Sequence, residues 1–183
     1  MKGIIMCILS EMVETQFGMT EWNEVLDEAG LTGVYTSSAL YSDDELLTLV
    51  SIISERNHVP VDDLIFAFGQ HLFPAFSSRY PKLISPYDNL FDFLECIDSV
   101  IHVEVKKLHP DAITPLFLHE RLSDRRLKLE YRSERQFCTL ALGLIDGAAE
   151  HFKQAYDLVH EPCLHHGADH CGFLINLKSV DDD

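Results

Sequence analysis

Three groups of residues in this sequence have types and spacings suited to binding a ligand or a metal. The first is a histidine, His102, on the flank of an apolar helical pattern. The second is a Tyr-x-Ser-x-Arg element that ends at Arg135, and the third is a Cys-x21-His-x2-Cys-x7-Cys series that begins at Cys138. These groups predict three kinds of chemistry: axial ligation of a metal, recognition of an anion and tetrahedral metal coordination.

His102 can serve as a metal or haem-iron ligand because a neutral imidazole offers a lone pair. A lone histidine beside an apolar stripe is also commonly a hydrogen-bonded core residue or an exposed one. His109 follows near the same helical face, and His119 lies beyond Pro115. The residue types alone leave all three histidines as candidate ligands.

The Tyr-x-Ser-x-Arg element follows a strand-like alternation in which Leu127 and Leu129 are the apolar positions. If the chain stays extended, Tyr131, Ser133 and Arg135 continue on the same inward face. An inward arginine needs an anionic partner. A carboxylate-bearing ligand would satisfy it, with the hydroxyls donating further bonds. Pairing with an acidic side chain is the alternative, and the chain has 30 acidic residues.

The Cys and His series comprises Cys138, His160, Cys163 and Cys171. Three thiolates and one imidazole form a tetrahedral set suited to zinc, with no open coordination position. The alternative is three buried thiols and a surface histidine. Three nearby histidines could replace His160: His165, His166 and His170.

Helices and strands that would position these residues can be read from the hydrophobic periodicity. Ser42 can cap one helix, and Glu45 would complete a capping box there. Pro60 can begin another helix. The expected helices are about 3–17, 20–28, 43–57, 60–76, 89–108 and 136–156, and alternation predicts strands at 127–131 and Cys171–Leu177. This order indicates an α+β protein with a helical first half.

Composition excludes several classes of partner. The chain of 183 residues has 14 basic and 30 acidic residues, a formal charge of -16, which repels nucleic acid and anionic membrane surfaces. The basic residues in 121–135 are interspersed with acidic ones, as on a mixed strand surface. No run approaches the roughly 18 apolar residues of a membrane span. Five cysteines favour reduced thiols or metal ligands, with Cys7 and Cys96 as inert core residues, and we expect a cytoplasmic protein.

Taken together, these residues resemble the H-NOX (haem nitric oxide/oxygen binding) family. The resemblance rests on Ile101-His102 through Lys107-Leu108, then Pro115, then the Tyr-x-Ser-x-Arg element. The opening Met1-Lys2-Gly3-Ile4-Ile5 and the segment Phe68-Gly69 are also similar to that family. The resemblance covers almost the whole chain.

Several roles are implied by this resemblance. His102 would be the axial ligand of haem b, and Pro115 would help to distort the macrocycle. Tyr131, Ser133 and Arg135 would hold the propionates. The fold would be one H-NOX domain over 1–183, with a helical N-terminal subdomain of about 1–60. A haem-binding subdomain with helices, an antiparallel sheet and the zinc site would follow at about 61–180.

The resemblance also implies which gas is bound. Oxygen-binding members of the family place a tyrosine where this chain has Leu140. With Ile5 and Leu144, Leu140 would form an apolar distal wall that gives bound oxygen no hydrogen-bond donor. Nitric oxide needs less help because its bond to ferrous iron is strong. We therefore expect nitric oxide to be bound and oxygen excluded.

The function implied is that of a sensor and not of an enzyme. Nitric oxide would bind ferrous haem, and a separate histidine kinase or cyclic-di-GMP enzyme would read the change. The chain is similar to a zinc-containing subset of the family, and oxidation of the zinc thiolates could provide a second, redox input. The alternative is a zinc-stabilised interaction module without haem, whose apolar pocket binds a lipid or a partner helix.

Overall fold

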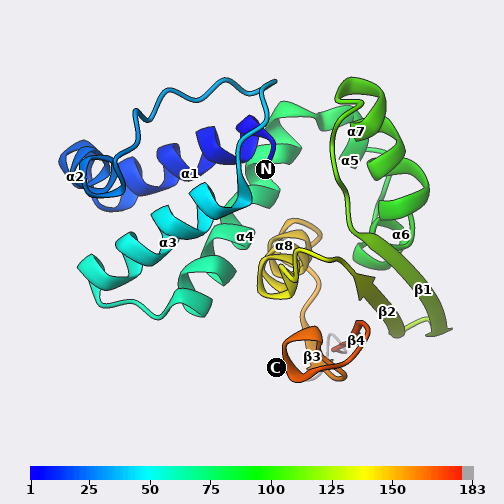
Figure 1. Ribbon diagram of the computed structural model, residues 1–183. Coiled ribbons are helices and arrows are strands. Elements are labelled where there is room, and N and C mark those ends of the chain that lie inside the picture. The colour runs from blue at the N-terminus through cyan, green and yellow to red at the C-terminus, as the bar shows by residue number, and fades with distance from the viewer. Residues whose placement is uncertain (179–183) are drawn as a thin grey trace.

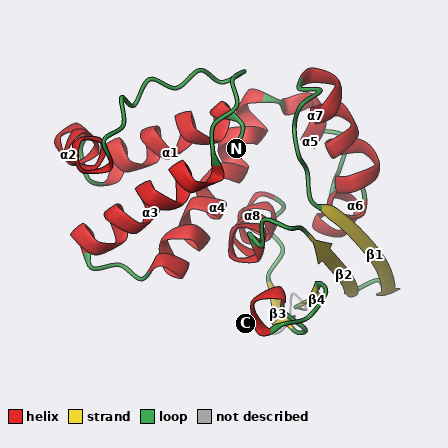
Figure 2. Cartoon of the chain, viewed as in Figure 1, coloured by secondary structure: helices red, strands yellow, loops and turns green. Residues whose placement is uncertain are grey.

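The computed structural model describes residues 1–178 and has an α+β fold, as the sequence predicted. Helices dominate the first half of the chain, and an antiparallel sheet follows in the second (Figures 1 and 2). The elements are α1 (Gly3–Gln16), α2 (Met19–Ala29), α3 (Asp43–Asn57), α4 (Val61–Arg79), α5 (Pro81–Ile84), α6 (Leu90–Glu95), the π-helical segment η1 (Ile97–Ile101), α7 (His102–Leu108), β1 (Leu116–Ser123), β2 (Arg126–Arg132), α8 (Cys138–His151), β3 (Tyr156–His160), the 3₁₀ turn η2 (Leu164–His166) and β4 (Cys171–Leu177).

The first four helices form where the apolar spacing predicted them, and they bury one face each. Ser42 caps α3 by accepting a hydrogen bond from the amide of Asp44 at 3.1 Å. The expected capping box is wrong, because the Glu45 carboxylate instead accepts a hydrogen bond from the Tyr35 hydroxyl at 2.9 Å. Thr20 lies inside α2, which begins at Met19 after Gly18 with a positive φ. Among residues 1–178, no helix is long and apolar enough to cross a membrane.

The sheet has the strand order β1-β2-β4-β3, with every neighbouring pair antiparallel. The expected strands at 127–131 and 171–177 are confirmed, and Leu127, Leu129 and Tyr131 are buried. The sequence did not predict β1 and β3. On β1 only Phe117 is buried, so that strand carries no alternation of apolar and polar residues. The expected helix to Tyr156 ends earlier, at His151, and Tyr156 begins β3.

The expected long helix from 89 to 108 is interrupted in its middle. Asn89 caps α6 by accepting from the amide of Asp92 at 2.9 Å. The backbone then widens into the π-helical segment η1, and the amide of His102 donates to the carbonyl of Ile97. A hydrophobic period cannot distinguish such a wider turn from a regular α-helix over only five residues.

The buried apolar residues form two clusters that meet at α4. One cluster is drawn from residues 6–72 and the other from residues 73–175. Helix α4 thus contributes to both, and Figure 1 shows α8 beside it in the middle of the molecule. The division near residue 60 stays a prediction.

Helices α4 and α8 approach closely because glycines face each other at their crossing. A Cβ atom on Gly143 would lie 2.1 Å from the carbonyl oxygen of Phe66 and 2.9 Å from Cα of Gly69. A Cβ atom on Gly69 would lie 2.5 Å from the carbonyl oxygen of Leu140. All three obstacles are backbone atoms, so a side chain at either position would push the two helices apart.

The variant Gly143→Ala should therefore be less stable than the wild type. Alanine favours a helix over glycine by about 1 kcal/mol, but overpacking a close contact costs about 1–3 kcal/mol. Because the added Cβ would meet a backbone oxygen at 2.1 Å, we take the upper end of that cost, about 3 kcal/mol, and expect a net loss of about 2 kcal/mol in the free energy of unfolding, measured by urea denaturation. The exposed Glu150→Ala on the same helix is the control. An equal or higher stability of Gly143→Ala would contradict the close helix contact.

Candidate functional site

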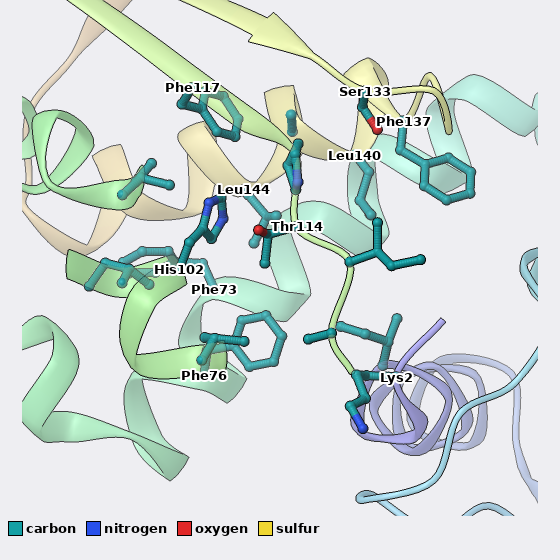
Figure 3. Close-up of a pocket in the computed structure, with 18 of the residues that line it drawn as sticks. Lys2, Phe73, Phe76, His102, Thr114, Phe117, Ser133, Phe137, Leu140 and Leu144 are labelled. Atoms are coloured by element: carbon teal, nitrogen blue, oxygen red, sulfur yellow. The ribbon is translucent and has the colours of Figure 1, made fainter. Parts of the chain in front are cut away.

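A cavity of about 350 Å³ lies between the N-terminal helices, the segment 97–109, the loop before β1 and helix α8. Its walls are mainly aliphatic and aromatic, and a few polar side chains enter it (Figure 3). This combination is typical of a site for a largely apolar ligand with a polar end. All eight residues expected to contact haem line this one cavity: Ile5, His102, Pro115, Tyr131, Ser133, Arg135, Leu140 and Leu144.

His102 begins α7, directly after η1, and its side chain is only 15% exposed. Figure 3 shows the imidazole in the cavity, near Phe117 and Thr114. Its Nδ1 lies 3.2 Å from Oδ1 of Asp98. Burial lowers the pKa of His102, while the contact with Asp98 acts in the opposite direction. The net effect favours a neutral ring with a lone pair for a metal.

The other two candidate histidines differ from His102 in position. His109 follows the end of α7 and also lines the cavity. His119 lies on β1 and is exposed. Of the three, His102 is the one that the carboxylate of Asp98 orients.

Tyr131, Ser133 and Arg135 all reach the cavity, but not by a continued strand. Strand β2 ends at Arg132, and the Ser133 hydroxyl accepts a hydrogen bond from the amide of Arg135 at 3.2 Å. The expectation of an extended chain through Arg135 is therefore wrong. A turn of this kind, stabilised by a serine side chain, brings Arg135 back toward the cavity. Burial raises the pKa of Tyr131, so its hydroxyl stays a neutral donor.

Arg135 has an acidic partner, as one of the two sequence interpretations allowed. Its guanidinium pairs with Asp43 on α3, and the amine of Met1 lies 2.8 Å from the same carboxylate. Burial alone would raise the pKa of the Asp43 carboxyl, but these two cations hold it below its ordinary value. The Nε of Arg135 is buried and has no hydrogen-bond partner among the described residues. Arg135 can therefore still donate to an anion in the cavity.

The part of the cavity wall formed by α1 and α8 is apolar, with Ile5, Leu140 and Leu144 among its residues. One of the polar lining residues that the sequence interpretation missed is Thr114, whose hydroxyl is buried without a partner among the described residues. Thr114 precedes Pro115 in the loop before β1 and lies near His102 in Figure 3. No sequence signal points to it, because a threonine before a proline is an ordinary loop residue.

The Cys and His series forms a second site on the C-terminal half. The potential ligand atoms of Cys138, His160, Cys163 and Cys171 all lie within 4.8 Å of one another. Cys138 starts α8, His160 ends β3 and Cys171 starts β4. The sulfur atoms of Cys163 and Cys171 are 3.8 Å apart. The structure thus brings together four ligand types that suit a tetrahedral metal ion.

The three other histidines near this cluster are not among its four potential ligands. His165 is exposed and contacts the backbone carbonyl of Gln136 at 2.9 Å, and His170 pairs with Asp169 at 2.6 Å. His166 is exposed. Cys7 and Cys96 are half-buried and lie outside the cluster. His160 is thus the imidazole that the fold places among the three thiols.

The electrostatics of the cluster favour a bound cation. Burial, followed by the proximity of Cys171 and Cys163, raises the pKa of the Cys138 thiol to about 12. Burial also lowers the pKa of His160, whose Nε2 is buried without a partner in the described part of the chain. A divalent ion deprotonates the thiols that coordinate it and would satisfy the imidazole nitrogen.

Comparison with known proteins identifies the group to which this arrangement corresponds. A model of the haem-NO-binding family matches residues 2–160. The crystal structure of an H-NOX protein from S. oneidensis in the Fe(II)NO state is 38% identical, covers 98% of this chain and 100% of that chain, and has a TM-score of 0.93.

Two further solved structures are similar over the same length. The Fe(II) unliganded H-NOX protein from K. algicida is 32% identical, with 100% of both chains covered and a TM-score of 0.90. The IWP-051-bound H-NOX from Shewanella woodyi is 36% identical, with 100% of this chain and 97% of that chain covered and a TM-score of 0.88. No match was found among curated proteins.

Proposed function

The chain belongs to the haem-NO-binding (H-NOX) family, a group of non-enzymatic sensor domains, and from that premise we propose that it senses nitric oxide. In this proposal the cavity holds haem b, the protein excludes oxygen, and a separate signalling protein reads the result. The observation that carries the proposal is that His102 lines the same apolar cavity as Tyr131, Ser133 and Arg135.

The residues present fit haem. The macrocycle is flat and apolar, which suits the aliphatic and aromatic walls. Its two carboxylates need cations and hydroxyl donors, and the unpartnered Nε of Arg135 with the hydroxyls of Tyr131 and Ser133 supplies them. His102 supplies an imidazole on the flank of the cavity. When bound, haem supplies a ferrous iron that can take a gas as a ligand.

Each of these cavity residues would have its own role toward haem. His102 would hold the iron through Nε2, because Nδ1 is engaged by Asp98. Arg135, Tyr131 and Ser133 would bind the carboxylates of the group. Pro115 lines the same cavity, and its rigid ring would press on one face of a planar ligand. Ile5, Leu140 and Leu144 would exclude water from a bound gas and offer it no hydrogen-bond donor.

The test is an absorption spectrum of the anaerobically reduced protein, before and after addition of nitric oxide, and separately in air. We expect a haem band that shifts with nitric oxide and not with oxygen. The variant Leu140→Tyr should gain a stable oxygen spectrum, because its hydroxyl can donate to the polar bound gas. Leu140→Phe has a similar bulk without the hydroxyl and is the matched control.

Two results would contradict this proposal. A wild-type protein that stays colourless after reconstitution with haem would favour the alternative, a zinc-stabilised module that binds a lipid or a partner helix. A stable oxygen spectrum for the wild type or for Leu140→Phe would contradict the selectivity assigned to the apolar wall.

We propose that the readout is a separate histidine kinase or cyclic-di-GMP enzyme. The support is the network of Met1, Asp43 and Arg135, which joins α3 and the chain start to the cavity. A change in the position of Arg135 would alter its pairing with Asp43 and so act on the N-terminal helices. The net charge of -16 would favour a partner with a basic surface.

We also propose that Cys138, His160, Cys163 and Cys171 bind zinc, as in a zinc-containing subset of the family. The support is the mutual proximity of the four ligand atoms and the buried Nε2 of His160, which has no hydrogen-bond partner within residues 1–178. Oxidation of a thiolate would remove a ligand, which makes the cluster a candidate redox input.

A further inference from the structure

We propose that Asp98 is a positioning residue for His102: its carboxylate accepts a hydrogen bond from Nδ1, directs the lone pair of Nε2 into the cavity, and strengthens the imidazole as an iron ligand. This inference rests on the proposed function, because it concerns the same haem site. The role of Asp98 does not depend on the Tyr-x-Ser-x-Arg element or on the zinc cluster.

Asp98 lies in the π-helical segment, four residues before His102, a spacing that places two side chains on the same side of a helix. The amides of Val100 and Ile101 both donate to the carbonyl of Cys96, at 2.9 Å and 3.1 Å, and the amide of His102 donates to Ile97. The wider turn ends directly before His102. It leaves the Asp98 carboxylate 3.2 Å from Nδ1 of that ring.

Asp98 has no second ion-pair partner among residues 1–178, so His102 is the group that its charge serves. Neighbouring carboxylates are engaged elsewhere: Asp92 and Glu95 pair with Arg121, and Glu104 pairs with Lys107. The Asp98 side chain is partly exposed, whereas the imidazole is mostly buried. The carboxylate thus remains hydrated on one side and acts on the ring from the other.

The chemical consequence is a fixed tautomer. A neutral imidazole carries one proton, and the hydrogen bond made by one nitrogen decides which nitrogen keeps it. A carboxylate at Nδ1 holds the proton there and leaves Nε2 bare. An anionic acceptor also raises the electron density of the ring and therefore its strength as a ligand. Asp98 would thus set how firmly His102 holds the iron.

Two variants separate the orientation of the ring from the charge beside it. Asp98→Asn keeps a carbonyl oxygen that can accept from Nδ1 but removes the charge. Asp98→Ala removes both. Glu104→Gln is the control, because it removes a carboxylate from the same helical region that pairs with Lys107 and not with His102.

The first measurement is the iron–histidine stretching band of the ferrous protein in resonance Raman spectra. We expect its frequency to fall from wild type to Asp98→Asn and further to Asp98→Ala, with Glu104→Gln equal to wild type. Haem should also dissociate about 10-fold faster from Asp98→Ala, the lower end of what loss of such an outer partner costs. A purely structural role for Asp98 would not order the three frequencies in this way.

The second measurement is the Nδ1 proton resonance of His102 in the diamagnetic ferrous carbonyl protein. We expect a slowly exchanging proton in wild type and Asp98→Asn, and a rapidly exchanging one in Asp98→Ala. Equal Raman bands in wild type, Asn and Ala variants would overturn the role of Asp98 and leave the haem site intact. A wild-type protein without an iron–histidine band would overturn the proposed function and this inference with it.

Discussion

His102→Gly is expected to abolish the iron–histidine band and to leave haem without a covalent attachment to the protein. Loss of an outer hydrogen-bond partner of a metal ligand already costs about 10–100-fold in affinity. Loss of the ligand itself should therefore lower haem retention by at least about 10-fold. Haem content is measured from the absorption of the purified protein relative to its total protein content.

Added imidazole provides a rescue that distinguishes coordination from packing. The glycine variant leaves a space the size of the missing ring, so free imidazole can enter and ligate the iron. We expect haem retention to recover with imidazole in His102→Gly. The control is His109→Ala, which also removes a cavity-lining histidine and should retain haem. Equal haem loss in both variants would contradict the assignment of His102 as the axial ligand.

Cys171→Ser is expected to lose bound zinc and to destabilise the C-terminal half of the protein. Cys171 is fully buried at the start of β4, and its sulfur accepts a hydrogen bond from the amide of Leu164 at 3.2 Å. The four ligands join α8, β3, the following loop and β4. Loss of a structural metal belongs among the largest single-residue effects, about 4 kcal/mol. For a chain of this length that corresponds to a fall in Tm of roughly 8–16 °C.

Zinc content by elemental analysis and Tm by calorimetry test this expectation. Cys96→Ser, which changes a half-buried thiol outside the cluster, should keep both values close to those of the wild type. A Cys171→Ser protein with undiminished zinc would refute the proposed ligand set. The same zinc assay after peroxide treatment examines the redox input, and unchanged zinc content and helicity would count against it.

The Tyr-x-Ser-x-Arg element that ends at Arg135 was predicted from the sequence only in part. The alternation of Leu127 and Leu129 correctly predicted that Tyr131 is buried, because a strand places alternate side chains on one face. It wrongly extended the strand through Ser133 and Arg135. Periodicity reports which face is buried, and it cannot show a turn in which a serine side chain bonds to the backbone.

The Cys and His cluster was also predicted only in part from the sequence. Residue types and spacing predicted Cys138, His160, Cys163 and Cys171 as a set, and the structure brings these four together. Spacing could not by itself separate His160 from three nearby histidines. The pairing of β3 with β4 decides that, because it holds His160 opposite Phe173 and close to Cys171.

Resemblance to a known family, and not periodicity or residue chemistry alone, pointed to the residues that line one cavity. The sequence by itself determined the helical first half and the buried faces of β2 and β4. These features depend on local periodicity and on residue chemistry, both of which are written along the chain. Only the tertiary structure decided that Asp43 and the Met1 amine pair with Arg135, that η1 interrupts the long helix, and that Asp98 contacts His102. The first depends on segments far apart in the chain that meet only after folding, and the second on a backbone turn whose hydrogen bonds leave no mark on the hydrophobic pattern. The third is a contact between residues four apart, which helical spacing permits and which the packing of the two side chains decides.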